Sequence, residues 1–164
     1  MATVALDGFE MYYEVRGEGE PLLLLHGGMG IGDDWRHIFP SDPEGYRVIV
    51  PDLRGHGRST SPAEGFTFRQ CANDVRSLLE HLGISQVKSI GLSMGAKTLL
   101  HLATAHPARV DAMVLVSATP SFPQTLRTAG GFSAAIGCQP RTGLSERKTS
   151  RPGTSGRRRL PRNQ

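Results

Sequence analysis

The chain has 164 residues, of which 38% are apolar, a net charge of +4 with neutral histidines, and two cysteines. A chain of this length can bury one core, but two cysteines cannot form a disulfide framework, and no apolar run is long enough for a membrane-spanning helix. Residues 1–16 carry acids where a signal peptide needs a basic flank and an apolar run, so we expect a reduced, cytoplasmic protein.

The first predicted elements are a hairpin and two buried strands. Residues Thr3–Leu6 and Phe9–Arg16 are predicted to pair, because Asp7-Gly8 between them tolerates the positive φ of a two-residue turn. Pro21–Leu25 and Arg47–Val50 are short, mostly apolar runs. Such runs are typical of strands that are buried on both faces of a sheet.

Two helices alternate with two further strands in the next part of the chain. Residues Arg69–Leu82 place apolar side chains on one face at helical spacing, and Gly83 is expected to end this helix. The helix Ala96–Ala105 carries apolar side chains on almost every face, as expected for a helix that packs against the centre of a sheet. Strands are predicted at Val87–Ile90 and Ala112–Val116. This alternation predicts a doubly wound, mostly parallel sheet whose ligand crevice lies outside the carboxyl ends of its strands.

The segment Gly91-Leu92-Ser93-Met94-Gly95 joins a predicted strand to a predicted helix, which is the context of a nucleophile elbow. A side chain at either glycine would clash, because the strand and helix backbones pass closely in so sharp a turn. The turn would hold the Ser93 hydroxyl clear of the sheet and direct the Met94 N–H toward developing negative charge. The pattern therefore predicts acyl-transfer chemistry with Ser93 as the nucleophile.

Two further motifs stand in a fixed order with this elbow. His26-Gly27-Gly28 follows the first buried strand, and the segment from Asp52 to Ser59, with the pattern D-x-R-G-x-G-x-S, follows the second. Together the three motifs resemble the α/β-hydrolase family over residues 4–119. The resemblance implies an oxyanion hole made by the N–H groups of Gly28 and Met94, with no cofactor and no metal ion.

The histidine and acid of a catalytic triad are not apparent. In this family the triad runs Ser, then Asp or Glu, then His along the chain. After Ser93 the acids are Asp111 and Glu146, and the histidines are His101 and His106. Asp111 enters a strand on the far side from the crevice, and the two histidines lie roughly 12 and 19 Å along the helix that leaves the elbow. We therefore expect an incomplete triad and at most very weak activity.

The histidines before Ser93 are given structural roles. His26 is expected to orient the oxyanion loop rather than to act as a base, and His56 to brace its own loop. His37 and His81 are expected to be solvated positions on helices.

The acidic residues in the same region are interpreted in a similar way. Asp52 is expected to make a loop-fixing hydrogen bond or to pair with Arg54, and Asp33-Asp34 to cap the helix that holds Trp35. No spacing of histidines and carboxylates indicates a metal site. Residues Gly27–Gly32 lack the Lys-Ser/Thr step of a phosphate loop and fit an oxyanion loop better.

The composition changes after Pro123, which divides a predicted partial hydrolase domain, 1–123, from a predicted disordered tail, 124–164. Residues 1–123 carry a charge of −4, and residues 124–164 have nine basic residues against one acid, hence +8. The tail could bind nucleic acid or membranes, could be merely solvated, or could be out-of-frame sequence of a GC-rich gene. We favour the last interpretation and expect no nucleic-acid binding, because no aromatic platform accompanies the arginines.

The sequence thus predicts the amino-terminal part of a serine hydrolase for a small ester- or amide-like substrate, truncated after about the sixth strand. Cofactor-free haloperoxidase or carbon–carbon bond hydrolase chemistry on the same elbow is one alternative, and a non-catalytic remnant is another. Without further strands, Ala112–Val116 would be an exposed apolar edge, at which we expect non-specific self-association.

Deleting residues 124–164 is expected to leave thermal unfolding almost unchanged. The tail has no apolar face to bury, and its charges can make only weak, screened contacts with the rest of the chain. Circular dichroism melts at low and moderate salt measure the effect. A drop of more than about 10 °C, which means over ~1.5 kcal/mol for a domain of this size, would show that the tail packs as structure.

Overall fold

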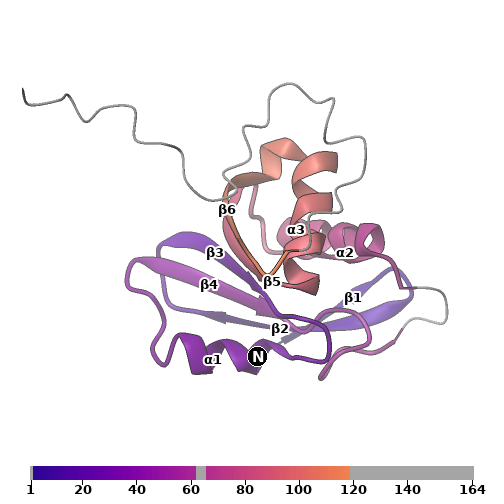
Figure 1. Ribbon diagram of the computed structural model, residues 1–164, viewed down its shortest axis with the longest axis horizontal. Helices are drawn as coiled ribbons and strands as arrows, with labels where there is room; N and C mark the ends of the chain where they lie inside the picture. The colour runs from indigo at the N-terminus through magenta and orange to yellow at the C-terminus, as the bar shows by residue number, and fades with distance from the viewer. Residues whose placement is uncertain (1, 62–65, 119–164) are drawn as a thin grey trace, which may run out of the picture.

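The computed structural model describes residues 2–61 and 66–118, and in this part of the chain six strands form one sheet (Figure 1). The strand order is β1-β2-β4-β3-β5-β6. β1 and β2 form an antiparallel hairpin, β2 also pairs antiparallel with β4, and β4, β3, β5 and β6 are mutually parallel. The strands are β1 Ala2–Leu6, β2 Phe9–Arg16, β3 Glu20–Leu25, β4 Tyr46–Pro51, β5 Val87–Leu92 and β6 Val110–Val116.

Three α-helices connect the parallel strands. They are α1 Trp35–Ile38, α2 Phe68–His81 and α3 Met94–Ala105, with 3₁₀ helices at Gly32–Asp34 and Pro107–Arg109. The Thr67 hydroxyl caps α2 by accepting the Gln70 N–H at 3.1 Å, and Gly83, at φ +68°, follows its end. These elements confirm the predicted doubly wound, mostly parallel sheet.

The two faces of the sheet are covered unequally. The larger core lies between the sheet and helices α2 and α3, where Leu23, Leu25 and Ile49 pack with Val75 and Leu99. A smaller core on the other face contains Leu22, Leu24, Trp35, Val48 and Val50. Successive residues of β3 alternate between the two cores, as the continuous apolar run of this strand predicts.

β6 forms one edge of the sheet within the described part of the chain (Figure 1). Two of its valines are largely solvent-exposed, Val114 at 55% and Val116 at 41%. Self-association through this edge stays a prediction. The proposed boundary at residue 123 and the tail 124–164 lie outside the described residues.

Candidate active site

Ser93 lies between the end of β5 and the first residue of α3, at the carboxyl edge of the parallel strands. Its backbone has φ +49° and ψ −100°, a conformation that non-glycine residues rarely adopt and that is typical of functional sites. The side chain is exposed. The Ser93 N–H donates to the Val116 carbonyl at 2.7 Å, which ties the turn to the end of the neighbouring strand.

The two glycines of the turn stand where the backbones pass closely, as predicted. A Cβ at Gly91 would meet the Ala96 nitrogen at 2.6 Å, and a Cβ at Gly95 would overlap the carbonyl oxygen of Leu25. The Gly95 N–H also donates to the His26 carbonyl at 3.1 Å. The first turn of α3 is thereby held against the end of β3, from which the loop of Gly28 begins.

The two N–H groups predicted for the oxyanion hole have no hydrogen-bond acceptor among residues 2–61 and 66–118. One belongs to Met94, the first residue of α3, where the positive end of the helix dipole lies. The other belongs to Gly28, in the loop that follows His26, and Gly28 is exposed. Donors of this kind can stabilise an oxyanion that forms beside them.

The buried His26 side chain uses both ring nitrogens to hold the loops around the site. The Leu53 N–H donates to Nε2 at 2.9 Å, so Nε2 carries no proton. The proton must then be on Nδ1, which lies 2.8 Å from the Gly27 carbonyl and donates to it. His26 therefore joins the loop after β3 to the loop after β4, in agreement with its expected orienting role, and is unavailable as a base.

His56 also matches its expected role within its own loop. Its Nδ1 lies 2.9 Å from the Arg54 carbonyl, and its ring centroid is 5.2 Å from that of His26. His81 is exposed at the end of α2, as expected, and its Nε2 also lies 3.2 Å from the Tyr13 hydroxyl. Spacing along α2 alone could not indicate this contact with β2.

Burial lowers the pKa of His26 below the usual 6.5; the neighbouring His56 acts in the same direction, and the Gly27 carbonyl opposes it. The folded chain therefore binds fewer protons at this ring than the unfolded chain does between the two pKa values. We expect the contribution of neutral His26 to folding stability to be complete above about pH 6.5. It should be lost as the pH falls through the folded-state pKa.

A ¹⁵N NMR titration of the ring measures this prediction directly. The expected result is the Nδ1–H tautomer at neutral pH and a midpoint below 6.5. His26→Gln should reduce the pH dependence of thermal unfolding below pH 6.5, and only partly, because burial also lowers the pKa of His101. A His26 midpoint above 6.5 would contradict the assignment of His26 as a neutral side chain that joins the loops after β3 and β4.

Asp52 fixes the loops, but it does not pair with Arg54. Its fully buried carboxylate accepts the Gly32 N–H at 2.7 Å and the Arg58 N–H at 2.9 Å, and Arg58 Nε lies 3.2 Å away. Arg54 instead binds Asp74 of α2 through two hydrogen bonds of 2.6 and 2.7 Å. Of the two roles expected for Asp52, the loop-fixing hydrogen bond is confirmed and the pair with Arg54 is wrong; Arg58 is the missed partner of Asp52.

The Asp33-Asp34 pair also acts differently from the prediction. The Asp34 carboxylate accepts the Ile31 N–H at 2.9 Å, at the start of the 3₁₀ helix, and makes no capping bond to α1. Asp33 lies 3.3 Å from Arg58 Nη2 and 3.6 Å from Arg36 Nε. The two acids thus stabilise the entry into the short helix and its contact with the Arg58 loop.

The later histidines and Asp111 lie at other places in the fold. The His101 ring stacks on Phe68 with a centroid distance of 6.3 Å, His106 follows the end of α3, and Asp111 is exposed at the start of β6. Within residues 2–61 and 66–118, no side chain makes a hydrogen bond to Ser93 Oγ. Glu146 lies outside the described residues.

The described part of the chain contains neither a membrane-spanning helix nor a cluster of metal ligands. None of its helices has both the length and the apolar character needed to cross a membrane. No three His, Cys, Asp or Glu side chains within it are grouped so as to hold a metal ion.

Comparison with known proteins gives consistent matches to one family. A family model described as "alpha/beta hydrolase fold" matches residues 20–134. A soluble epoxide hydrolase of Corynebacterium sp. strain C12 is 37% identical over 115 residues, which are 70% of this chain and 40% of the relative. A non-heme haloperoxidase of Rhodococcus erythropolis is 36% identical over 120 residues, 72% of this chain and 44% of the relative.

Solved structures give the same result. The epoxide hydrolase CorEH is 36% identical with a TM-score of 0.69, over 74% of this chain and 46% of that chain. Est816, described as an N-acyl homoserine lactone degrading enzyme, is 35% identical with a TM-score of 0.67, over 71% of this chain and 45% of that chain. The chain thus spans less than half the length of these relatives.

Proposed function

The chain belongs to the α/β-hydrolase family, and we propose that it supplies the nucleophile and the oxyanion hole for acyl transfer from a small ester- or amide-like substrate. Ser93 Oγ is the nucleophile. The N–H groups of Gly28 and Met94 are the oxyanion hole.

The conformation of Ser93 is the observation that carries this proposal. The residue is exposed at the carboxyl edge of the sheet with φ +49°, while its neighbours in the turn are packed against β3. Attack of Oγ on a substrate carbonyl would place negative charge on the carbonyl oxygen, and the two N–H donors are the groups available to stabilise it. Departure of the alcohol or amine would leave an ester on Ser93, which water then hydrolyses.

Acylation of Ser93 in this chain is proposed to be slow. Acylation requires a base for the Ser93 proton, and His26 already accepts a hydrogen bond at Nε2. The 164-residue chain by itself is therefore a very weak enzyme, and full activity needs an acid and a histidine from elsewhere.

A serine nucleophile is unsuited to the hydrolysis of an epoxide, the reaction for which the Corynebacterium relative is named. Attack of a serine oxygen on an epoxide carbon would leave an ether on Ser93. An ether has no carbonyl for water to attack, so the cycle could not close. Carbonyl substrates, as in the lactone-degrading Est816, fit Ser93 better.

Cofactor-free haloperoxidase chemistry is the second candidate, because the Rhodococcus haloperoxidase is 36% identical over 120 residues. An assay of bromide oxidation by hydrogen peroxide distinguishes this reaction from hydrolysis. Peroxide-dependent bromination that is lost in Ser93→Ala would favour it over simple ester hydrolysis.

Mass spectrometry after incubation with p-nitrophenyl acetate tests the main proposal. Without an efficient base, the acetyl ester should form slowly and be hydrolysed slowly, so an acetyl group should accumulate on Ser93. Ser117 provides a matched control, since it is also exposed at the carboxyl edge with positive φ, at +55°. Acetylation should disappear in Ser93→Ala and persist in Ser117→Ala. Acetylation of other residues alone would contradict the proposal.

A further inference from the structure

A cavity of about 580 Å³ lies between the start of α2 and helix α3. Residues 66–69 line it from the segment that leads into α2, and His101 lines it from α3. The volume is within the range of small-molecule sites, roughly 300 to 1,000 Å³. Ser93 is not among the lining residues, so the cavity is separate from the site proposed for acyl transfer.

Two phenylalanines give the cavity an aromatic wall. Phe66 is 48% exposed and meets Phe68 edge to face, with ring centroids 6.0 Å apart. The His101 ring is stacked on Phe68 at 6.3 Å. An exposed phenylalanine that is held beside two packed rings offers a surface on which another planar ring can pack.

The charged side chains at this cavity are basic within residues 2–61 and 66–118. Arg69 is exposed, and Lys97 Nζ lies 5.2 Å from the centroid of the Phe68 ring. Burial lowers the pKa of His101, and the positive charge of Arg69 acts in the same direction. No carboxylate in the described part of the chain forms an ion pair with Arg69 or Lys97. The cavity therefore has a positive potential that attracts an anion.

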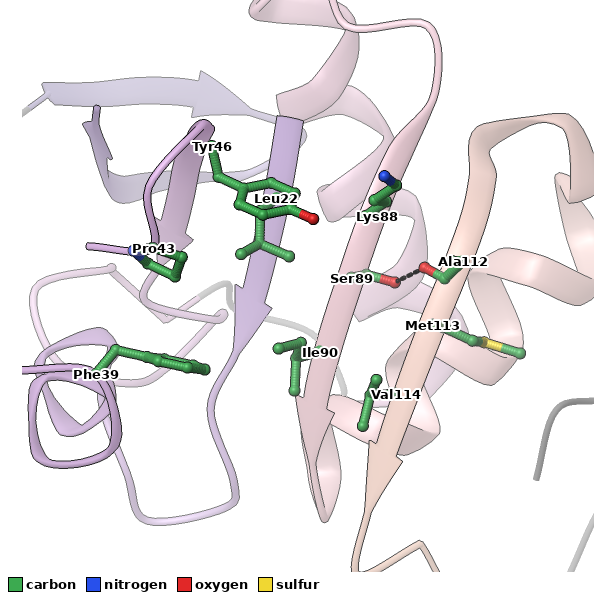
Figure 2. Close-up of a pocket in the computed structure, with 10 residues that line it drawn as sticks. All are labelled: Leu22, Phe39, Pro43, Tyr46, Lys88, Ser89, Ile90, Ala112, Met113 and Val114. Carbon is green, nitrogen blue, oxygen red and sulfur yellow. Dashed lines mark hydrogen bonds between the residues drawn. The ribbon is translucent and has the colours of Figure 1, made fainter. Parts of the chain in front are cut away.

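The groove in Figure 2 differs in this respect. It has a volume of about 310 Å³ and lies between Phe39 and strands β5 and β6. The charged side chain that lines it, Lys88, is neutralised by Glu20, whose carboxylate oxygen is 2.5 Å from Nζ. A small-molecule site needs a few polar groups that remain available to orient the ligand. Of these two places, the cavity at α2 is thus the better site for a charged ligand.

We propose that the cavity at α2 binds a small aromatic carboxylate. The ring of the ligand packs on Phe66, and its carboxylate accepts hydrogen bonds from Arg69. A guanidinium group suits this role, because its planar fork matches the two oxygens of a carboxylate. Lys97 supplies a second positive charge. This inference goes beyond the proposed function and does not depend on the role of Ser93.

NMR titration of the full chain with benzoate tests the proposal. Benzoate should bind saturably with a Kd of about 1 mM or lower. Acetate and inorganic phosphate lack the ring, and benzyl alcohol lacks the charge, so each should bind at least about tenfold more weakly. The His101 ring resonances should shift with benzoate, and the pKa of this ring should rise, because a nearby negative charge favours its protonated form.

Variants of the lining residues locate the ligand. Arg69→Gln should weaken benzoate binding at least about tenfold, and Phe66→Ala at least about threefold. Arg47→Gln is the matched control, since it removes the same charge from the second residue of β4, outside the cavity, and it should change the affinity less than about twofold. Ser93→Ala should bind benzoate like the unaltered chain, which separates this result from that of the proposed function.

Three results would overturn the proposal. The first is the absence of saturable benzoate binding to the folded chain. The second is equal binding to Arg69→Gln, which would place the ligand elsewhere, provided that circular dichroism shows this variant to be folded. The third is acetate or phosphate binding as tight as that of benzoate, which would show that the aromatic wall takes no part.

Discussion

Gly95→Ala is expected to lower the free energy of unfolding by about 3 kcal/mol or more, at the upper end of the usual cost of overpacking. The added methyl group would overlap the carbonyl oxygen of Leu25, and that oxygen belongs to the backbone of β3, which cannot rotate away. The midpoint of thermal unfolding should fall by more than about 10 °C. Differential scanning calorimetry or circular dichroism measures the change.

Gly28→Ala is the matched control for stability. It makes the same chemical change at a glycine where no heavy atom lies within 4 Å of an added Cβ. Its unfolding midpoint should stay within about 2 °C of that of the unaltered chain, as for an unstrained surface substitution. If Gly95→Ala were equally stable, α3 would not pass so close to β3, and the geometry assigned to the turn would be wrong.

The 164-residue chain is expected to hydrolyse p-nitrophenyl acetate far below the turnover of ordinary enzymes, which is roughly 1 to 10³ per second. The oxyanion hole and substrate binding alone retain about 10³ to 10⁴ over the uncatalysed reaction when a triad is removed. Steady-state kinetics of the chain and of Ser93→Ala measure this residual activity. Turnover in the ordinary range that is abolished by Ser93→Ala would contradict the proposal that the chain alone lacks a base.

The strands and the turn at Ser93 could be predicted because their signals are local. The apolar run Pro21–Leu25 needs burial on both faces, and Gly91 and Gly95 flank the serine at the spacing that a sharp turn requires. The helix after the turn was predicted to begin at Ala96, but α3 begins at Met94. Glycine is a poor helix former, so propensity alone favours a later start, whereas packing against β3 includes Gly95 in the helix.

The partners of the charged side chains could not be predicted in the same way. Asp52 and Arg54 are two residues apart, yet Arg54 binds Asp74, twenty positions along the chain. Adjacency in a loop does not show which way a side chain points once the strand has ended. Asp52 reaches back to the Gly32 N–H because β3 and β4 are neighbours and their loops leave the same edge of the sheet.

Labelling with a fluorophosphonate probe tests the central claim, that Ser93 is a nucleophile beside an oxyanion hole, most directly. The probe should label Ser93 slowly, because an unassisted hydroxyl is a weak nucleophile. Labelling should vanish in Ser93→Ala and persist in Ser117→Ala. It should also persist in His26→Gln, whose amide oxygen can accept the Leu53 N–H that the imidazole Nε2 accepts. Labelling that survives in Ser93→Ala would contradict Ser93 as the nucleophile, and rapid labelling lost in His26→Gln would show that His26 serves as its base.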